Sequence, residues 1–242
     1  MLDVRLIHAL AKRTYRQSVE TPIAYVVAIF FYGFVGGIFG SNYFLNNQGS
    51  LAPMLQIAPW LLWFVIPTLT MGLLSEEFRL GTFEHLATLP VRDWEIVLGK
   101  YLGFAFLAFL LTLGLGAYAL VVCFTTQPVP GIDWGETVGV MAGLYFLCLV
   151  NGAMGIFASS LTKNQVVSLI LGMILCTIFF ITGQLTSLFP PLLGRLVDFI
   201  GVLSHLSSLG RGVWDLRDLI YFGSLVFFFL FLTVQRLATR RY

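Results

Sequence analysis

Hydrophobic and polar positions form long blocks along this chain. Residues 21–75 contain no Asp, Glu, Lys or Arg, and no such residue lies between Lys100 and Asp133. Because a helix needs about 20 apolar residues to cross a bilayer, both stretches are long enough to span a membrane. Along the whole chain this pattern predicts six membrane-spanning helices, at residues 22–45, 54–74, 101–126, 138–161, 166–189 and 219–234.

Two further segments have the pattern of amphipathic helices. In residues 1–20 the apolar side chains and the charged ones fall largely on different sides, which predicts a helix lying in the membrane interface; a solvated leader is the alternative. Residues 192–218 lie between the last two spans. Their helical repeat predicts amphipathic helices on the outer surface and is carried by Leu203, Leu206, Leu209 and Val213.

Composition supports an integral membrane protein. The chain is 58% hydrophobic and 11% charged, whereas soluble domains are about 25% charged. We therefore expect an all-α fold, organised as a single membrane domain over residues 1–242. The charged first 20 residues exclude a cleavable signal peptide.

The basic residues predict the orientation. With six spans, 11 Lys and Arg residues fall on the side of both termini and three on the other side. Under the positive-inside rule both termini and the 75–100 loop are then cytoplasmic. We therefore expect a multi-pass membrane protein with this orientation.

The sequence lacks the residues of several functional classes. No ionisable residue lies well inside a span, which argues against proton-coupled carriers. The nucleotide-phosphate pattern GxxxxGK[ST], the zinc pattern HExxH and the GxSxG elbow are missing. Three cysteines lie in spans and three histidines are distant from one another, so we expect no metal or cofactor; these are Cys123, Cys148, Cys176, His8, His85 and His205. The sequence contains no run of basic residues that would predict nucleic-acid binding. We conclude that the chain is not an enzyme and that any energy comes from a partner.

Glycines in the first span predict close helix packing. Gly33 and Gly37 form one small-xxx-small pair, and Gly36 and Gly40 form another. Such pairs let a neighbouring helix approach closely; the alternative is that glycine is simply common in membrane helices.

The loop at residues 75–100 holds eight of the chain's 14 basic and 12 acidic side chains. It predicts a rigid helix that leaves the second span, stops at Leu89-Pro90 because a residue before proline disfavours helical geometry, and returns as the third span. Such a segment is suited to receive a push from a partner in the aqueous compartment. A solvated hairpin without a partner is the alternative.

These residues resemble a known family. The run EEFRLGTFEHL at 76–86, followed by LPVR at 89–92 and WEIVLGKYL at 94–102, resembles the loop signature of the permease subunits of type-2 ABC transporters, the ABC-2 exporters. TPIAY at 21–25 resembles the entry to the family's first span. Residues 204–219 resemble the outer segment of a narrower branch, the gliding-motility-type permeases.

The resemblance implies an ABC-2 exporter fold: six spans, an N-terminal interfacial helix and a coupling helix in the 75–100 loop. It also implies a multi-pass protein of the bacterial inner membrane. The permease would pair with a second copy, or work beside a related membrane subunit that has a large periplasmic domain. Two copies of an ABC ATP-binding subunit would bind ATP and Mg. With the chain ending at Tyr242, we expect no fused ATPase. The predicted ATPase-contacting residues are Glu76, Glu77, Arg79, Gly81, Thr82, Phe83, Glu84, Leu86, Pro90 and Arg92.

Two hypotheses therefore remain from the sequence. In the first, the chain is the permease subunit of an ABC exporter that couples ATP hydrolysis to substrate export or to force on a periplasmic partner. In the second, it is a non-transporting membrane scaffold or anchor of a multi-protein complex. A membrane enzyme is a distant third, because paired acid, base or metal groups are missing. The substrate cannot be read from the sequence.

Overall fold

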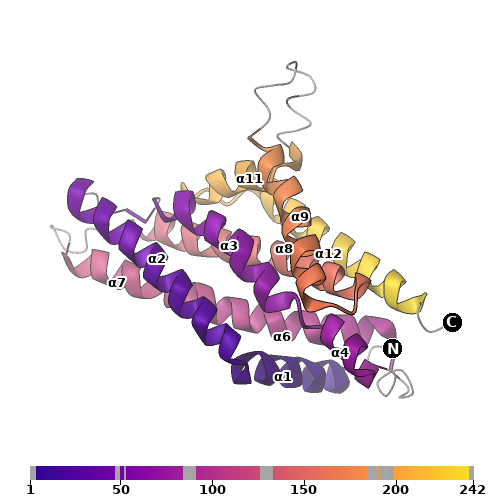
Figure 1. The fold of residues 1–242 in the computed structure, drawn as a ribbon. Helices are drawn as coiled ribbons and strands as arrows, with labels where there is room; N and C mark the ends of the chain where they lie inside the picture. Colours follow the sequence, from indigo (N-terminus) through magenta and orange to yellow (C-terminus); the bar gives the residue numbers. More distant parts are fainter. Residues whose placement is uncertain are drawn as a thin grey trace.

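The chain forms a bundle of helices in a computed structural model (Figure 1). It describes residues 4–46, 50–51, 53–83, 91–125, 133–184, 190, 194 and 199–239, and this part contains no β-strand. In chain order the helices are α1 (Val4–Glu20), α2 (Pro22–Asn46), α3 (Met54–Thr70), α4 (Ser75–Leu80), α6 (Asp93–Gly114), α7 (Gly116–Thr125), α8 (Trp134–Leu161), α9 (Gln165–Thr182), α11 (Val202–Leu209) and α12 (Leu216–Ala238).

Six helical segments of the described chain are long and apolar enough to cross a membrane. They coincide with the six predicted spans and confirm the all-α membrane fold. Two of them are interrupted: α3 ends at Thr70, three residues after Pro67, and the third span is divided between α6 and α7 at Leu115. Three others begin earlier or end later than predicted, because the helices extend past the apolar stretch: α6 begins at Asp93, α8 begins at Trp134 and α12 covers Leu216–Ala238. Residues 185–189, predicted as the end of the fifth span, lie outside the described residues.

Helix α8 occupies the centre of the bundle and packs against α3, α6, α9 and α12. A larger share of its apolar segment is buried than in any of the other five spans. Glycines on α8 allow this close packing. A Cβ atom at Gly152 would lie 2.0 Å from Cε1 of Phe104 on α6, and one at Gly155 would lie 2.0 Å from Oγ1 of Thr70 on α3. The core therefore depends on glycine where α6 and α3 cross α8.

The amphipathic helix α1 lies alongside the first half of α6 (Figure 1). Gly99 and Gly103 of α6 face it: a Cβ at Gly99 would lie 2.5 Å from Cβ of Leu10, and one at Gly103 would lie 2.6 Å from the carbonyl oxygen of Ala11. The edge of the Tyr15 ring meets Phe106, with ring centroids 4.9 Å apart. The apolar face predicted for this segment thus packs on α6, and its place in the membrane interface stays a prediction.

A substitution at this contact is expected to weaken the bundle. Gly103→Val would place a side chain against the backbone of α1, and overpacking of this kind costs about 1–3 kcal/mol. The matched control is Gly33→Val, because a Cβ at Gly33 meets no atom within 4 Å. Thermal unfolding in one detergent should show a lower Tm for Gly103→Val than for Gly33→Val; equal values would mean that α1 is not seated on α6.

The glycine pairs predicted to pack the first span do not do so within this chain. A Cβ at Gly33, Gly37 or Gly40 of α2 would meet no described atom within 4 Å, and only Gly36 is crowded, by the hydroxyl oxygen of Tyr118 at 2.4 Å. The physical reason is that α2 lies at the edge of the bundle with one face open. The closest glycine contacts are instead those of Gly152 and Gly155 on α8.

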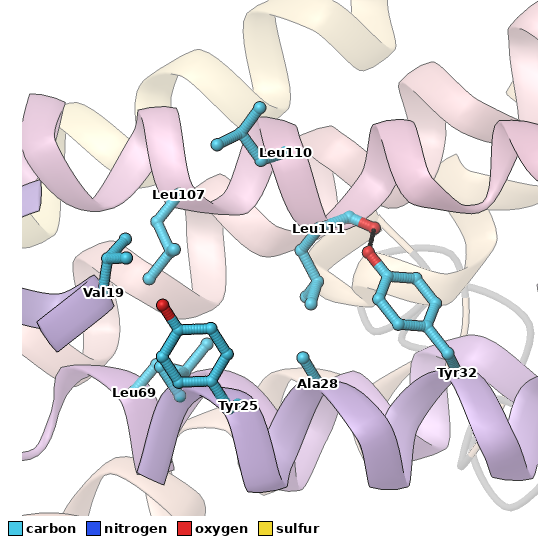
Figure 2. Close-up of a pocket in the computed structure, with 9 residues that line it drawn as sticks. Val19, Tyr25, Ala28, Tyr32, Leu69, Leu107, Leu110 and Leu111 are labelled. Atoms are coloured by element: carbon cyan, nitrogen blue, oxygen red, sulfur yellow. Dashed lines mark hydrogen bonds between the residues drawn. The ribbon is translucent and has the colours of Figure 1, made fainter. Parts of the chain in front are cut away.

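An apolar cavity of about 160 Å³ lies between α2 and α6, with Val19 of α1 and Leu69 of α3 also in its lining. Figure 2 shows Tyr25 near one end and Tyr32 near the other. The Tyr32 hydroxyl donates a hydrogen bond to the carbonyl oxygen of Leu111 at 2.7 Å. This contact closes one end of the cavity and joins α2 to α6.

At the end of the bundle opposite α4, helix α11 packs on α8. Leu206 and Leu209 are buried there, as the amphipathic pattern predicted. A Cβ at Gly139 of α8 would lie 2.1 Å from the carbonyl oxygen of Leu209. Val213 was expected on the same face but is exposed, because α11 ends at Leu209 and Gly212 turns the chain with a φ of 73°.

Candidate functional site

The candidate site is the α4 segment, defined as residues 71–83. It consists of the turn 71–74 after α3, the helix α4, and residues 81–83. Gly81 ends the helix in the left-handed conformation at a φ of 71°, which glycine adopts without the steric penalty of a Cβ. The helix predicted to continue to Leu89-Pro90 therefore ends earlier, at Leu80, because Gly81 turns the backbone; the predicted stop itself lies outside the described residues.

Ser159 of α8 holds the turn in place. Its Oγ accepts hydrogen bonds from the backbone amides of Leu74 at 3.0 Å and Ser75 at 2.9 Å. It also donates to the carbonyl oxygen of Met71 at 2.8 Å. This uses the single donor and both acceptor positions of a hydroxyl, so the start of α4 is fixed to the central helix.

A buried ion pair holds α4 to α6. Lys100 Nζ lies 2.8 Å from Oε1 of Glu77, and the side chains are 5% and 14% exposed. The same ammonium group donates to the carbonyl oxygen of Leu73 at 2.6 Å. Such a pair persists in a dry environment only when further hydrogen bonds satisfy the charges, and Leu73 supplies one. Lys100 therefore connects the start of the third span with both the turn and α4.

The outer face of α4 is polar and exposed. Arg79, Leu80 and Thr82 are exposed, and Leu80 is 63% exposed. Glu76 is half-buried, and its Oε1 lies 3.5 Å from Nη2 of Arg79, a weak surface contact. This face is thus available to a molecule outside the bundle.

The predicted contact residues divide into three groups. Glu76, Arg79, Gly81 and Thr82 lie together on or beside α4, and Arg92 is exposed before α6. Glu77 and Phe83 face inward instead: the side chain of Glu77 is 14% exposed and pairs with Lys100, and Phe83 is 7% exposed with its ring edge against Phe78. Glu84, Leu86 and Pro90 lie outside the described residues.

Sequence reasoning missed Lys100, Ser159 and Leu80 as parts of this site. A signal existed only for Lys100, because a single lysine at the beginning of an apolar span is costly to bury without a partner. Nothing in the sequence connected Ser159, 85 residues from Leu74, with the turn. Leu80 was passed over because an apolar residue beside a span is unremarkable until its exposure is known.

A second polar cluster lies at the α11 end. His205 Nδ1 lies 2.6 Å from Oδ1 of Asp218, and its Nε2 lies 3.0 Å from the carbonyl oxygen of Phe199. The Ser208 hydroxyl donates to the other carboxylate oxygen of Asp218. The sequence interpretation treated His205 as isolated; its partner is at the start of α12, 13 residues away.

This cluster is not arranged as a nucleophile with a base. Both histidine nitrogens face oxygen atoms within hydrogen-bond distance, and Ser208 contacts the carboxylate rather than the imidazole. A carbonyl oxygen only accepts, so Nε2 carries a proton. We interpret the cluster as a structural joint between α11 and α12. In the described part of the chain no group of three or more His, Cys, Asp or Glu residues could hold a metal ion.

The fold and the α4 segment together define a multi-pass helical membrane protein. The sequence model of the ABC-2 type transporter family matches residues 5–188. The chain therefore belongs to this family and is the permease subunit of an ABC exporter. Permeases of this family are non-catalytic and normally pair with a separate ABC ATP-binding subunit. No curated protein matches the chain.

Proposed function

We propose that the α4 segment is the coupling segment, on which the ATP-binding subunit docks and through which its motion reaches the spans. The observation that carries this proposal is the pair of attachments described above. One face of α4 is joined through Glu77 to Lys100 of α6, and its turn is joined to Ser159 of α8. Its other face is exposed. A push on that face is therefore delivered to two spans at once.

The contact surface follows from exposure. We propose Glu76, Arg79, Thr82 and Arg92 as polar contacts, with Gly81 setting the end of the helix. Leu80 replaces Phe83 as the apolar contact, because Phe83 is packed against Phe78. Glu84, Leu86 and Pro90 remain proposed contacts from the sequence. Two ATP-binding subunits would bind ATP and Mg, one beneath each of two permease copies.

We further propose that the chain lies in the bacterial inner membrane with both termini cytoplasmic. The support is the division of Lys and Arg residues, 11 against three. The same orientation brings the α4 segment to the compartment that holds ATP. It is tested by labelling single cysteines at Thr82 and Trp214 with an impermeant maleimide in intact cells: only the Trp214 position should react.

The resemblance of residues 204–219 to the gliding-motility-type branch supports a finer proposal. In that branch the permease works beside a membrane subunit with a large periplasmic domain, so the output would be force on a periplasmic partner or export of a substrate. The alternative function is a non-transporting scaffold. If ATP hydrolysis by the purified complex changed the conformation of the permease at its periplasmic face, this result would favour the exporter over the scaffold.

The docking proposal is tested by exposed substitutions on α4. Leu80→Asp and Glu76→Lys should each reduce co-purification of the ATP-binding subunit from detergent-solubilised membranes, because the first removes the apolar contact and the second reverses a charge. Reversal at Glu77 is a poor test, because it would place two cations together in a buried position. Co-purification is quantified against the permease recovered.

The control is Trp214→Asp, an exposed apolar residue at the opposite end of the bundle. It should leave co-purification unchanged. If Leu80→Asp and Glu76→Lys retained the ATP-binding subunit as well as Trp214→Asp does, α4 would not be the docking site.

A further inference from the structure

A polar cleft lies between α4 and the connection from α8 to α9. Its volume is about 440 Å³, and its lining residues are Arg79, Thr162, Lys163, Asn164, Gln165 and Val166. Figure 1 shows this connection beside α4, and α4 contacts both α8 and α9. The family resemblance and the docking proposal concern the 75–100 loop, so the α8–α9 side of this cleft has no role yet.

The charge in the cleft is positive. Arg79 and Lys163 are both exposed and approach from different elements, and the lining contains no carboxylate. Lys163 forms no ion pair with the described residues. Among the residues that the structure describes, the one ion pair of Arg79 is the contact of 3.5 Å with Glu76 at the edge of the cleft, and exposed pairs of this kind contribute little. Both cations are therefore available to an anionic partner.

The positive charge comes from these side chains rather than from the backbone of α9. The side chain of Asn164 accepts a hydrogen bond from the amide of Val166 at 2.9 Å, and Thr162 Oγ1 accepts from the amide of Asn164 at 3.1 Å. The two walls of the cleft also lie close to each other. The side-chain nitrogen of Gln165 lies within 3.4 Å of the position that a Cβ at Gly72 would occupy, against the turn before α4.

We propose that this cleft binds acidic side chains of the ATP-binding subunit, as a second contact beside α4. The inference rests on the proposed docking at α4 and adds the α8–α9 connection to it. A carboxylate matches the forked donors of Arg79 and the point charge of Lys163. The cleft is continuous with the exposed face of α4 through Arg79, which belongs to both. The same surface presents Glu76 to a basic group, so the two contacts are opposite in charge and favour a single orientation of the partner.

The test uses the permease in nanodiscs of pure phosphatidylcholine and the ATP-binding subunit that co-purifies with it. Binding is measured by biolayer interferometry at low and at high salt. Lys163→Glu should weaken binding about tenfold at low salt, and the difference should shrink at high salt. The matched control is Arg236→Glu, an exposed cation near the end of α12 and outside the cleft, which should bind like the unmodified permease.

A photo-crosslinking residue in place of Lys163 then identifies the partner's segment. The inference expects an adduct on a peptide rich in Asp or Glu, and expects a charge reversal in that peptide to restore binding to Lys163→Glu. Nanodiscs containing phosphatidylglycerol test whether the cleft binds an anionic lipid headgroup instead. If Lys163→Glu changed only the retention of that lipid, the cleft would be a lipid site and the inference would be wrong.

The outcomes separate the inference from the proposal beneath it. Weaker binding for both Leu80→Asp and Lys163→Glu supports both. Weaker binding for Leu80→Asp alone overturns the cleft contact and leaves docking at α4 intact. Unchanged binding for both variants overturns the docking proposal and the inference with it.

Discussion

Replacing Lys100 with methionine is expected to lower the free energy of unfolding by about 3 kcal/mol, because it leaves the mostly buried carboxylate of Glu77 without its cation. The substitution also removes the hydrogen bond to the carbonyl oxygen of Leu73. Methionine has a similar length and an apolar stem, so the loss reports the charge rather than a cavity. Thermal unfolding of the purified permease in one detergent is the measurement, and a lower Tm is the expected result.

The control is the double variant Glu77→Gln with Lys100→Met. Because both charges are then gone, most of the lost stability should return. A double variant that unfolds as early as Lys100→Met alone would show that the ion pair is not the source of the effect. A Lys100→Met protein with unchanged Tm would contradict the buried pair itself.

Asp218→Ala is expected to have a similarly large effect at the other end of the bundle, about 3 kcal/mol. Asp218 is buried, and both of its carboxylate oxygens have partners. Its removal would leave Nδ1 of the buried His205 without its partner, and a buried polar group without a partner is costly. The joint between α11 and α12 should loosen, which faster hydrogen exchange of the α11 amides would show.

Asp218→Asn gives the matched comparison, because an amide keeps the shape and one acceptor oxygen. It should lose less stability than Asp218→Ala and keep α11 protected. Asp215→Ala provides a second control. Asp215 caps α12 through the amide of Arg217 at 2.9 Å and is exposed, so its loss should cost only about 1 kcal/mol. Equal effects for all three variants would mean that the buried cluster adds nothing beyond a helix cap.

The sequence predicted the spans well, because hydropathy over about 20 residues is set by the bilayer and needs no knowledge of neighbours. It predicted less about which helices meet. The glycines of α2 and of α6 look alike in sequence, yet Gly103 faces α1 and Gly33 faces open space. Which glycine is crowded depends on the order in which the spans pack, and that order is a property of the whole bundle.

The charged residues of the loop located the candidate site, but they did not predict which of its side chains are exposed. The sequence grouped Glu76 and Glu77 together as surface acids, whereas one is half-buried beside Arg79 and the other is paired with Lys100. Adjacent residues of a helix point about 100° apart, so their environments differ once the helix is seated. The partner of Glu77, Lys100, lies 23 residues further along the chain. The two residues meet because α6 returns to the same end of the bundle as α4.

The division of the third span at Leu115 has a mechanical consequence. The amide of Leu115 bonds to the carbonyl oxygen of Thr112 at 3.0 Å, while the carbonyl of Leu111 is satisfied by Tyr32 from the neighbouring helix. A backbone group left open to hydrocarbon would cost several kcal/mol. Because Tyr32 already provides a hydrogen bond to the carbonyl oxygen of Leu111, we expect the span to bend at this point with little cost in free energy. Under the proposed coupling at α4, we expect a displacement of Lys100 to move the part of α6 before Leu111. Both sides of the break stay with α2, because Tyr32 donates to Leu111 and its carbonyl oxygen accepts from the Tyr118 hydroxyl at 2.7 Å.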